Sequence, residues 1–146
     1  NPAVRFELFA REEYVLVGSD RSLLRAPDRE SILKNLFVSY PGMDVLFDLW
    51  AGHYLGGRVS HENLQIAGSI DSLHGAITML ENGVGLSVLP RHCVEDRLKA
   101  GTLFEGPKLG KKPLQNEIHI VTLDGVRQPR RVLVVLDAFW EMKKAG

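Results

Sequence analysis

Hydrophobic and polar positions along this chain switch repeatedly between the spacing of a strand and the spacing of a helix. The clearest unit runs from residue 70 to residue 90. Within it, apolar side chains recur at helical spacing, which predicts an amphipathic helix with an inward face of Leu73, Ala76, Ile77 and Leu80. Gly83 follows where a left-handed residue ends many helices. The short apolar run 85–89 then predicts a buried strand.

The ends of these elements carry matching cap signals. Asp71 and Ser72 both accept hydrogen bonds from the first free N–H groups of a helix, so either is a candidate N-cap. Gly85 allows the chain to turn tightly into the strand. Pro90 suits the first position of a following helix, where its missing N–H costs nothing.

The same two periods predict the elements of the remaining chain. Strands are expected at 13–17, 37–39, 64–68, 85–89, 102–104 and 117–123. Helices are expected at 28–36 (capped by Asp28), 43–54, 72–82, 91–100 and 128–144. In the last helix, the residues expected to face inward are Val132, Val135, Leu136 and Phe139. This alternation predicts βαβ units and a mainly parallel sheet covered on both faces, an α/β fold.

Composition adds limits to this picture. The 146 residues suit one domain, and 45% hydrophobic with 25% charged residues is typical of a globular protein. The 18 basic and 18 acidic residues cancel, whereas a nucleic-acid-binding surface normally has a basic face. Cys93 is the single cysteine, which excludes an internal disulfide and fits a reducing compartment. The cysteine count thus leads us to expect a cytoplasmic protein. The apolar run 132–136 is far too short to cross a membrane.

Signals for catalysis are weak. His92 and Cys93 are neighbours, but neighbours on a helix do not face each other, so we expect a buried structural cysteine. Asp44 and Asp48 lie one helical turn apart, which suits paired carboxylates, yet a solvated or capping role is the more common one. No catalytic residue is predicted.

Signals for metals and cofactors are also weak. His53 and His61 are too irregularly placed for a metal pair, and one cysteine cannot complete a zinc set. The glycines of 83–85 lack the third glycine of a dinucleotide-binding fingerprint. We therefore predict neither a metal site nor a cofactor.

Two corners of the predicted sheet are candidates for a ligand site. Open parallel sheets bind ligands beyond the carboxyl ends of their strands, where helix N-termini point and favour an anion. The first corner, 40–44, follows the strand at 37–39, and the second, 68–72, follows the strand at 64–68. The candidate binding residues are Tyr40, Gly42, Met43, Asp44, Ser69, Ile70, Asp71 and Ser72.

An alternative remains open for these residues. Ser69, Asp71 and Ser72 are equally typical of plain helix caps and turns. Asp44 and Asp71 would also place negative charge near an anionic ligand. A ligand with hydroxyl or amino groups is therefore as compatible with the sequence as a carboxylate.

The stretch 70–90 resembles the effector-binding domain of LysR-type transcriptional regulators. In that family a similar Ser-Leu-containing helix leads into a Gly-x-Gly turn and a strand that ends in Leu-Pro. The chain can be laid along the family from Phe6 to about Trp140. One departure lies at 21–24, where Arg-Ser-Leu-Leu stands in place of the His-Pro-Leu-Ala frequent in the family. That loop is not expected to touch ligand.

The resemblance implies a periplasmic-binding-protein-like fold of type 2, with a small effector in the cleft between two lobes and both corners lining that cleft. Residues 18–117 would form one complete lobe, and residues 1–17 with 118–146 would form part of the other. The rest of that lobe and a DNA-binding winged helix would precede this chain, which we therefore expect to be a fragment. The implied hinge residues are Val17, Gly18, Ser19, Glu117 and Ile118.

By the same resemblance, we expect the chain to sense a small molecule for a bacterial transcription factor and not to be an enzyme. It would form a homodimer or higher homo-oligomer, and it would reach DNA only through the winged helix. Two alternatives remain. A solute-binding receptor of the same fold would need a secretion signal, and an enzyme on the same scaffold would need a catalytic residue outside these residues. The effector and the target genes are not predicted.

Overall fold

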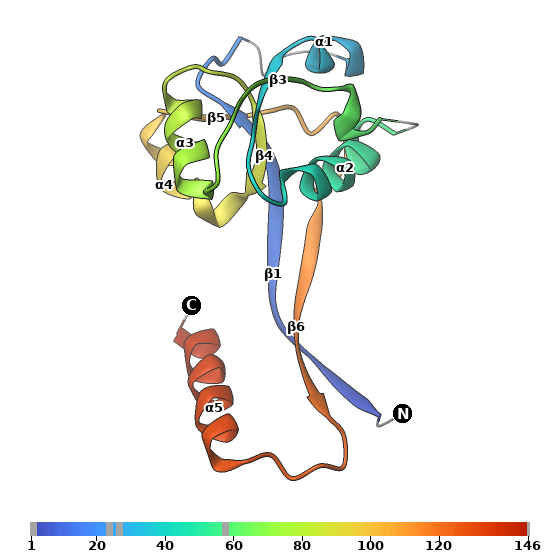
Figure 1. Ribbon diagram of the computed structural model, residues 1–146, viewed down its shortest axis with the longest axis vertical. Helices are drawn as coiled ribbons and strands as arrows, with labels where there is room; N and C mark the ends of the chain where they lie inside the picture. Colours follow the sequence, from blue (N-terminus) through green and yellow to red (C-terminus); the bar gives the residue numbers. More distant parts are fainter. Residues whose placement is uncertain (1–2, 23–24, 26–27, 57–58, 146) are drawn as a thin grey trace. The chain divides into compact units, whose positions relative to one another are not determined.

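The computed structural model describes residues 3–22, 25, 28–56 and 59–145 (Figure 1). The chain divides into two compact units, which are described separately. The central unit comprises residues 13–115, and the terminal unit comprises residues 1–12 together with 116–146.

The sheet of the central unit begins with a parallel pair. β2 (Leu36–Ser39) and β3 (Gln65–Ser69) run side by side in the same direction. A parallel bridge between Phe37 and Leu86 connects β2 to the start of β4 (Ser87–Pro90). These strands confirm the expected parallel arrangement for this part of the sheet.

β1 (Val4–Gly18) departs from the predicted parallel arrangement. It pairs antiparallel with β4 on one side and with β5 (Phe104–Glu105) on the other. The expectation of a mainly parallel sheet is therefore wrong for β1. A strand that is buried on both faces is a continuous apolar run, such as residues 14–17, and such a run carries no information about strand direction.

The helices of the central unit follow the predicted order. α2 (Met43–Tyr54) has the expected bounds. Of the two candidate N-caps of α3, Ser72 is the one used, because its hydroxyl oxygen accepts a hydrogen bond from the Gly75 N–H at 3.2 Å. The elements are α1 (Arg29–Leu33), α2 (Met43–Tyr54), the 3-10 turn η2 (His61–Asn63), α3 (Leu73–Glu81), the 3-10 turn η3 (Arg91–Cys93) and α4 (Glu95–Ala100). The single helix expected at 91–100 is thus broken at Val94, whose φ of −122° is outside the helical range.

The core of the central unit is apolar and fully enclosed. Phe37 and Phe47 meet edge to face with their ring centroids 5.6 Å apart, and Trp50 continues the cluster along α2. Ser87 is the buried polar side chain among the described residues, and its Oγ donates to the Val38 carbonyl at 2.9 Å. This bond satisfies the hydroxyl group away from water.

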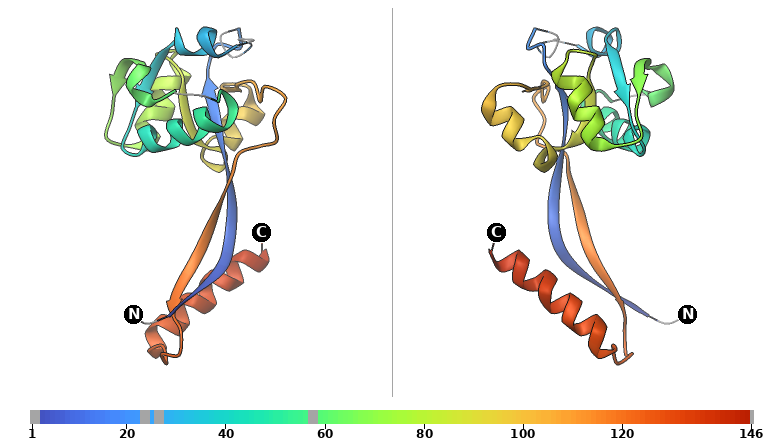
Figure 2. Two further views of the ribbon diagram at one scale, coloured as in Figure 1. Left: turned by 90° about the vertical axis from the view of Figure 1, so that its right-hand side faces the viewer. Right: turned by 60° about the vertical axis from the view of Figure 1, so that its left-hand side comes forward.

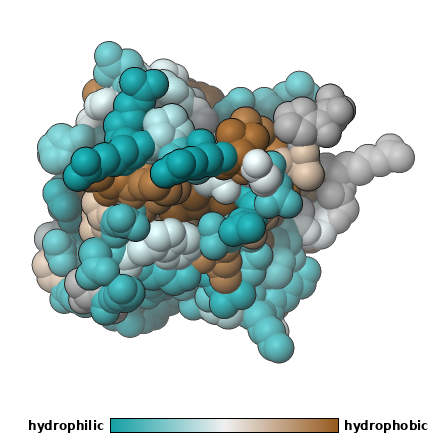
Figure 3. Space-filling view, turned by 90° about the horizontal axis from the view of Figure 1, so that it is seen from below, coloured by the Kyte–Doolittle hydropathy of each residue, from teal (hydrophilic) through white to brown (hydrophobic). Residues whose placement is uncertain are grey.

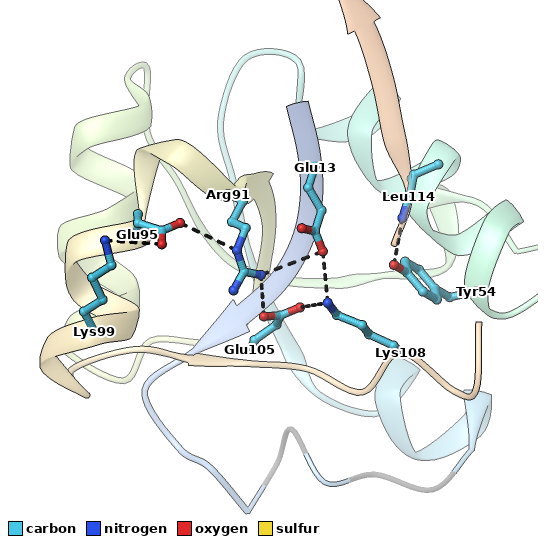
Figure 4. A network of polar contacts seen from close by, with 8 residues as sticks. All are labelled: Glu13, Tyr54, Arg91, Glu95, Lys99, Glu105, Lys108 and Leu114. Carbon is cyan, nitrogen blue, oxygen red and sulfur yellow. Dashed lines mark hydrogen bonds and ion pairs between the residues drawn. The ribbon is translucent and has the colours of Figure 1, made fainter. Parts of the chain in front are cut away.

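An ion-pair network surrounds the point where β1 enters the central unit (Figure 4). Arg91 binds Glu105 and lies 3.8 Å from Glu13, while Lys108 Nζ lies 3.1 Å from Glu13 and 3.4 Å from Glu105. The carboxylates raise the pKa of Arg91, chiefly through the hydrogen bond that Arg91 donates to Glu105. Glu13 and Glu105 are the least exposed members, so the two cations compensate half-buried negative charge.

The terminal unit contains β6 (Gln115–Leu123), which pairs with β1, and α5 (Arg130–Ala145) (Figure 1, Figure 2). Phe9 packs edge to face against Phe139, with 5.5 Å between ring centroids. Arg11 forms a 2.9 Å ion pair with Glu117.

The inward face predicted for α5 is only partly correct. Val132 and Leu136 are half-buried, but Val135 is 53% exposed and Phe139 is 41% exposed. Helical spacing identifies an apolar stripe and not what covers it, and the described part of the terminal unit leaves Val135 and Phe139 exposed. Hydrophobic surface among hydrophilic side chains is visible in the space-filling view (Figure 3). Within the described residues, no helix is long and apolar enough to cross a membrane.

Candidate functional site

A pocket of about 420 Å³ lies in the central unit, at the carboxyl ends of the parallel strands β2 and β3. This is the edge of an open sheet at which ligands usually bind. The residues that line it are Ser39, Tyr40, Pro41, Gly42, Asp44, His61, Ser69 and Ile70.

Backbone hydrogen bonds hold the two predicted corners together. The Ile70 N–H donates to the Ser39 carbonyl at 3.0 Å, so the residue after β3 is tied to the last residue of β2. The Met43 N–H donates to the Tyr40 carbonyl at 3.0 Å and closes the turn that opens α2. Gly42 at this turn has a φ of +90°, a conformation that favours glycine. The pocket wall is therefore built largely from fixed backbone.

Tyr40 is anchored from below the pocket. Its hydroxyl donates to the Val88 carbonyl in β4 at 2.8 Å, and the residue is buried. Burial raises the pKa of the Tyr40 hydroxyl well above its ordinary value, so the group stays protonated. Because its hydroxyl is already engaged, Tyr40 contributes mainly its ring to the pocket.

His61 reaches the pocket from the separate turn η2. Asp48 of α2 holds it twice, since Oδ1 accepts from the His61 backbone N–H at 2.7 Å and Oδ2 lies 2.9 Å from Nδ1. The hydrogen bond to Asp48 is the main cause that raises the pKa of His61, and the charges of Asp44 and Glu62 act in the same direction. An ionised Asp48 favours the tautomer with hydrogen on Nδ1, which leaves Nε2 for a ligand.

The structure places the predicted binding residues in two groups. Tyr40, Gly42, Asp44, Ser69 and Ile70 all line this one pocket. The other three lie outside its lining: Met43 is buried beneath the turn, Ser72 caps α3, and Asp71 is exposed next to that cap. A binding role for any of these residues stays a prediction.

Three lining residues were missed by the sequence analysis. Pro41 lies inside the predicted corner 40–44 but was not among the candidate residues, and Ser39 directly precedes that corner, so a wider window would have included it. His61 lies in the turn before β3, and no periodic pattern marks it. Its pairing with Asp48 joins residues that are thirteen positions apart, and local spacing does not reveal such a pair.

The predicted hinge residues of β1 lie within the sheet of the central unit. Val17 is fully buried and stands opposite Ser87 of β4, and Gly18 stands opposite Phe104 of β5. Ser19 follows in a bend. The boundary between the compact units lies earlier on this strand, between residues 12 and 13.

The other predicted hinge residues, Glu117 and Ile118, lie in β6 of the terminal unit. They are the second and third residues after the second unit boundary, which lies between residues 115 and 116. The Leu114 N–H donates to the Tyr54 hydroxyl at 2.9 Å just before this boundary (Figure 4). Hinge motion at either crossing stays a prediction.

The histidine and cysteine next to each other in sequence do meet in the structure. Cys93 Sγ lies 3.2 Å from His92 Nε2, so the expectation that they do not face each other is wrong. They belong to the tighter 3-10 turn η3 and not to a regular helix. Cys93 is half-buried, which also corrects the expectation of a buried cysteine. Among the described residues, no three histidine, cysteine or acidic side chains form a group able to hold a metal.

A second hollow in the central unit has a volume of about 560 Å³. It touches Gln65, the first residue of β3, and therefore lies at the amino end of that strand, away from the edge at which α/β sheets bind ligands. Its lining residues are Asp28, Arg29, Glu30, Leu33, Lys34 and Gln65.

The alternating elements, with one antiparallel strand in an otherwise parallel sheet, form an α/β fold of the periplasmic-binding-protein-like type 2 class. The family model of the LysR substrate binding domain matches residues 1–144. The chain therefore belongs to the LysR substrate-binding domain family, as the resemblance of residues 70–90 predicted. A comparison with curated protein sequences found no match.

Solved structures that are similar to this chain include regulatory domains and a full-length LysR-type regulator. The CrgA regulatory domain from Neisseria meningitidis has a TM-score of 0.69 at 14% identity, with 95% of this chain and 68% of that chain covered. Full-length LysG from Corynebacterium glutamicum, with bound effector Arg, has a TM-score of 0.71 at 18% identity, with 98% and 48% covered. The Synechocystis PCC6803 CcmR regulatory domain, in complex with 2-PG, has a TM-score of 0.71 at 15% identity, with 98% and 68% covered. This chain thus spans between about half and two thirds of their lengths.

Proposed function

We propose that this chain senses a small-molecule effector for a LysR-type transcriptional regulator, and that the effector binds at the pocket formed by the ends of β2 and β3. The observation that carries this proposal is the pocket itself, where two loop corners are tied together at the ligand-binding edge of the sheet. The hydroxyls of Ser39 and Ser69 offer polar contacts, and Ile70 offers an apolar one.

The similar structures support a small metabolite as the ligand. LysG was solved with bound effector Arg, CcmR with 2-PG, and the effector binding domain of QuiR with shikimate. Each of these ligands belongs to its own protein, and their variety indicates a fold that accepts different small polar molecules. The same comparison supports a regulatory and non-catalytic role.

We propose that binding shifts the population between two arrangements of the lobes. The central unit would act as one lobe and the terminal unit as part of the other, with the effector between them. Bending would occur in the segments around Val17–Ser19 and Glu117–Ile118. Two chain crossings support a hinge built from two strands: the one at 115–116 lies next to Glu117, and the one at 12–13 lies on β1 ahead of Val17. The change in lobe arrangement would act on a DNA-binding domain outside these residues. The regulator would be a cytoplasmic homodimer or larger homo-oligomer.

A ligand screen with a blocked pocket tests the effector proposal. A metabolite library is screened by thermal shift against the chain and against Ser69→Phe, which would fill the pocket from the end of β3. Thr78→Phe, which adds the same ring to an exposed position of α3, is the matched control. We expect at least one metabolite to stabilise the chain and Thr78→Phe but not Ser69→Phe. A metabolite that stabilises all three equally would contradict binding at this pocket.

A further inference from the structure

The charge lining the pocket indicates the chemical class of its ligand. Among the described lining residues, the ionisable groups at neutral pH are the carboxylate of Asp44 and the imidazole of His61, and there is no lysine or arginine. Asp44 is exposed in the first turn of α2. Within the described residues, no hydrogen bond or ion pair occupies its carboxylate, whereas Asp48 is engaged twice by His61.

The N-terminus of α2 does not reverse this negative character. A helix N-terminus carries roughly half of an elementary positive charge, whereas an ionised carboxylate in the same turn carries a full negative one. His61 is balanced by Asp48 even when it is protonated. The partial charge of the α2 N-terminus is therefore smaller than the charge of Asp44, and an anionic ligand would meet Asp44 without a lysine or arginine from the described lining to compensate it.

We infer that the effector carries a cationic group, an ammonium or a guanidinium, which binds the carboxylate of Asp44. This inference rests on the proposed function of the pocket and adds the ligand class. Such a group only donates hydrogen bonds, and the pocket offers it acceptors in Asp44 and in the hydroxyl oxygens of Ser39 and Ser69. The hydrocarbon part of the ligand would pack on Pro41 and Ile70.

Three probes of similar size and different charge test the inference: benzylamine, benzyl alcohol and benzoate. Each is titrated into the isotope-labelled chain at neutral pH, and binding is followed by the amide chemical shifts of the central unit. We expect benzylamine to shift the amides around Asp44 and Ile70, and to bind at least about tenfold more tightly than benzoate, a difference of about 1.4 kcal/mol. Benzyl alcohol should lie between the two.

Two variants make the test specific. Asp44→Asn should weaken benzylamine binding about tenfold and reduce its advantage over benzoate, because the ion pair is lost. Asp96→Asn, which removes an exposed carboxylate of α4, should leave both affinities unchanged. An equal loss in both variants would mean that benzylamine senses only net charge, and this would overturn the inference.

The outcomes separate the inference from the proposed function. Tighter binding of benzoate or benzyl alcohol at the same amides would overturn the cationic class and leave the pocket as the binding site. If none of the probes shifts the pocket amides, the inference is also overturned. The proposed function is judged by the Ser69→Phe metabolite screen, which makes no assumption about ligand charge.

Discussion

The backbone at Gly85 leaves no room for a side chain. A Cβ atom at this position would lie 2.5 Å from the Leu36 carbonyl oxygen, which is part of the connection between β2 and β4. Glycine was predicted here to allow a tight turn, and the structure adds a stronger reason, the close approach of two backbones. Gly83, two positions earlier, has the φ of +74° expected of a residue that ends a helix.

Gly85→Ala should therefore destabilise the central unit by about 1–3 kcal/mol, because the strands must separate to admit the methyl group. Gly52→Ala is the matched control: Gly52 lies within α2 with nothing within 4 Å of an added Cβ, so alanine should stabilise by about 0.5–1 kcal/mol. Urea unfolding, followed by the NMR signals of the central unit, measures both. Equal effects of the two variants would contradict the steric argument.

His61 and Asp48 predict a dependence of stability on pH. Asp48 raises the pKa of His61 in the folded state above its ordinary value, so the folded state holds the proton more tightly than the unfolded state. The stability from this pair is fully present below pH 6.5 and is lost as the pH rises through the raised pKa.

The measurement is an NMR titration of the His61 ring, combined with urea unfolding on both sides of its pKa. Asp48→Asn should lower the pKa of His61 and flatten the pH dependence that comes from this residue. Glu62→Gln should have a smaller effect, because the charge of Glu62 is a minor cause of the shift. An unchanged His61 pKa in Asp48→Asn would show that the pair does not persist in solution.

At the scale of elements, the network around Arg91 connects β1 to η3 and to β5 (Figure 4). Arg91→Gln would leave the half-buried Glu13 and Glu105 with Lys108 as their remaining cation in the network. Because the arginine side chain is about one-third exposed, solvent screening limits the cost, and we expect a loss of about 1 kcal/mol in unfolding free energy.

Lys99→Gln provides the control for that variant. Lys99 is 70% exposed and pairs with Glu95, so its loss should change the unfolding free energy by less than about 0.5 kcal/mol. Urea unfolding of both variants at low and high salt gives the comparison. A loss in Arg91→Gln no larger than in Lys99→Gln would show that the network adds nothing to the stability of the central unit.

Helices and strands could be predicted from the sequence where the spacing of neighbouring apolar residues marked them. The apolar spacing of Leu73, Ala76 and Leu80 defined α3, and these residues are packed in the core or against it. The direction of β1 could not be predicted, because a doubly buried strand looks the same in either direction. The exposed first half of β1 was missed for a related reason, since residues 4–7 show no buried face.

At the scale of the whole molecule, the family was predicted from one stretch and is confirmed over residues 1–144. The predicted corners at 40–44 and 68–72 each contribute residues to one pocket because both follow neighbouring parallel strands, although Asp71 and Ser72 lie outside its lining. His61 could not be found in this way, because it arrives from a turn that no periodic pattern connects to the site. The sequence therefore predicted the location of pocket residues that the order of strands brings together. It did not predict a residue that is held at the pocket by one side-chain pair.

The central claim is that the effector binds at the ends of β2 and β3, and the most direct test is to map where it binds. The first metabolite that stabilises the chain is titrated into isotope-labelled protein, and the amide shifts are assigned. The account predicts that the largest shifts in the central unit fall on residues 39–44, His61 and residues 69–70. Largest shifts at residues 28–34 and Gln65, around the second hollow, would contradict it.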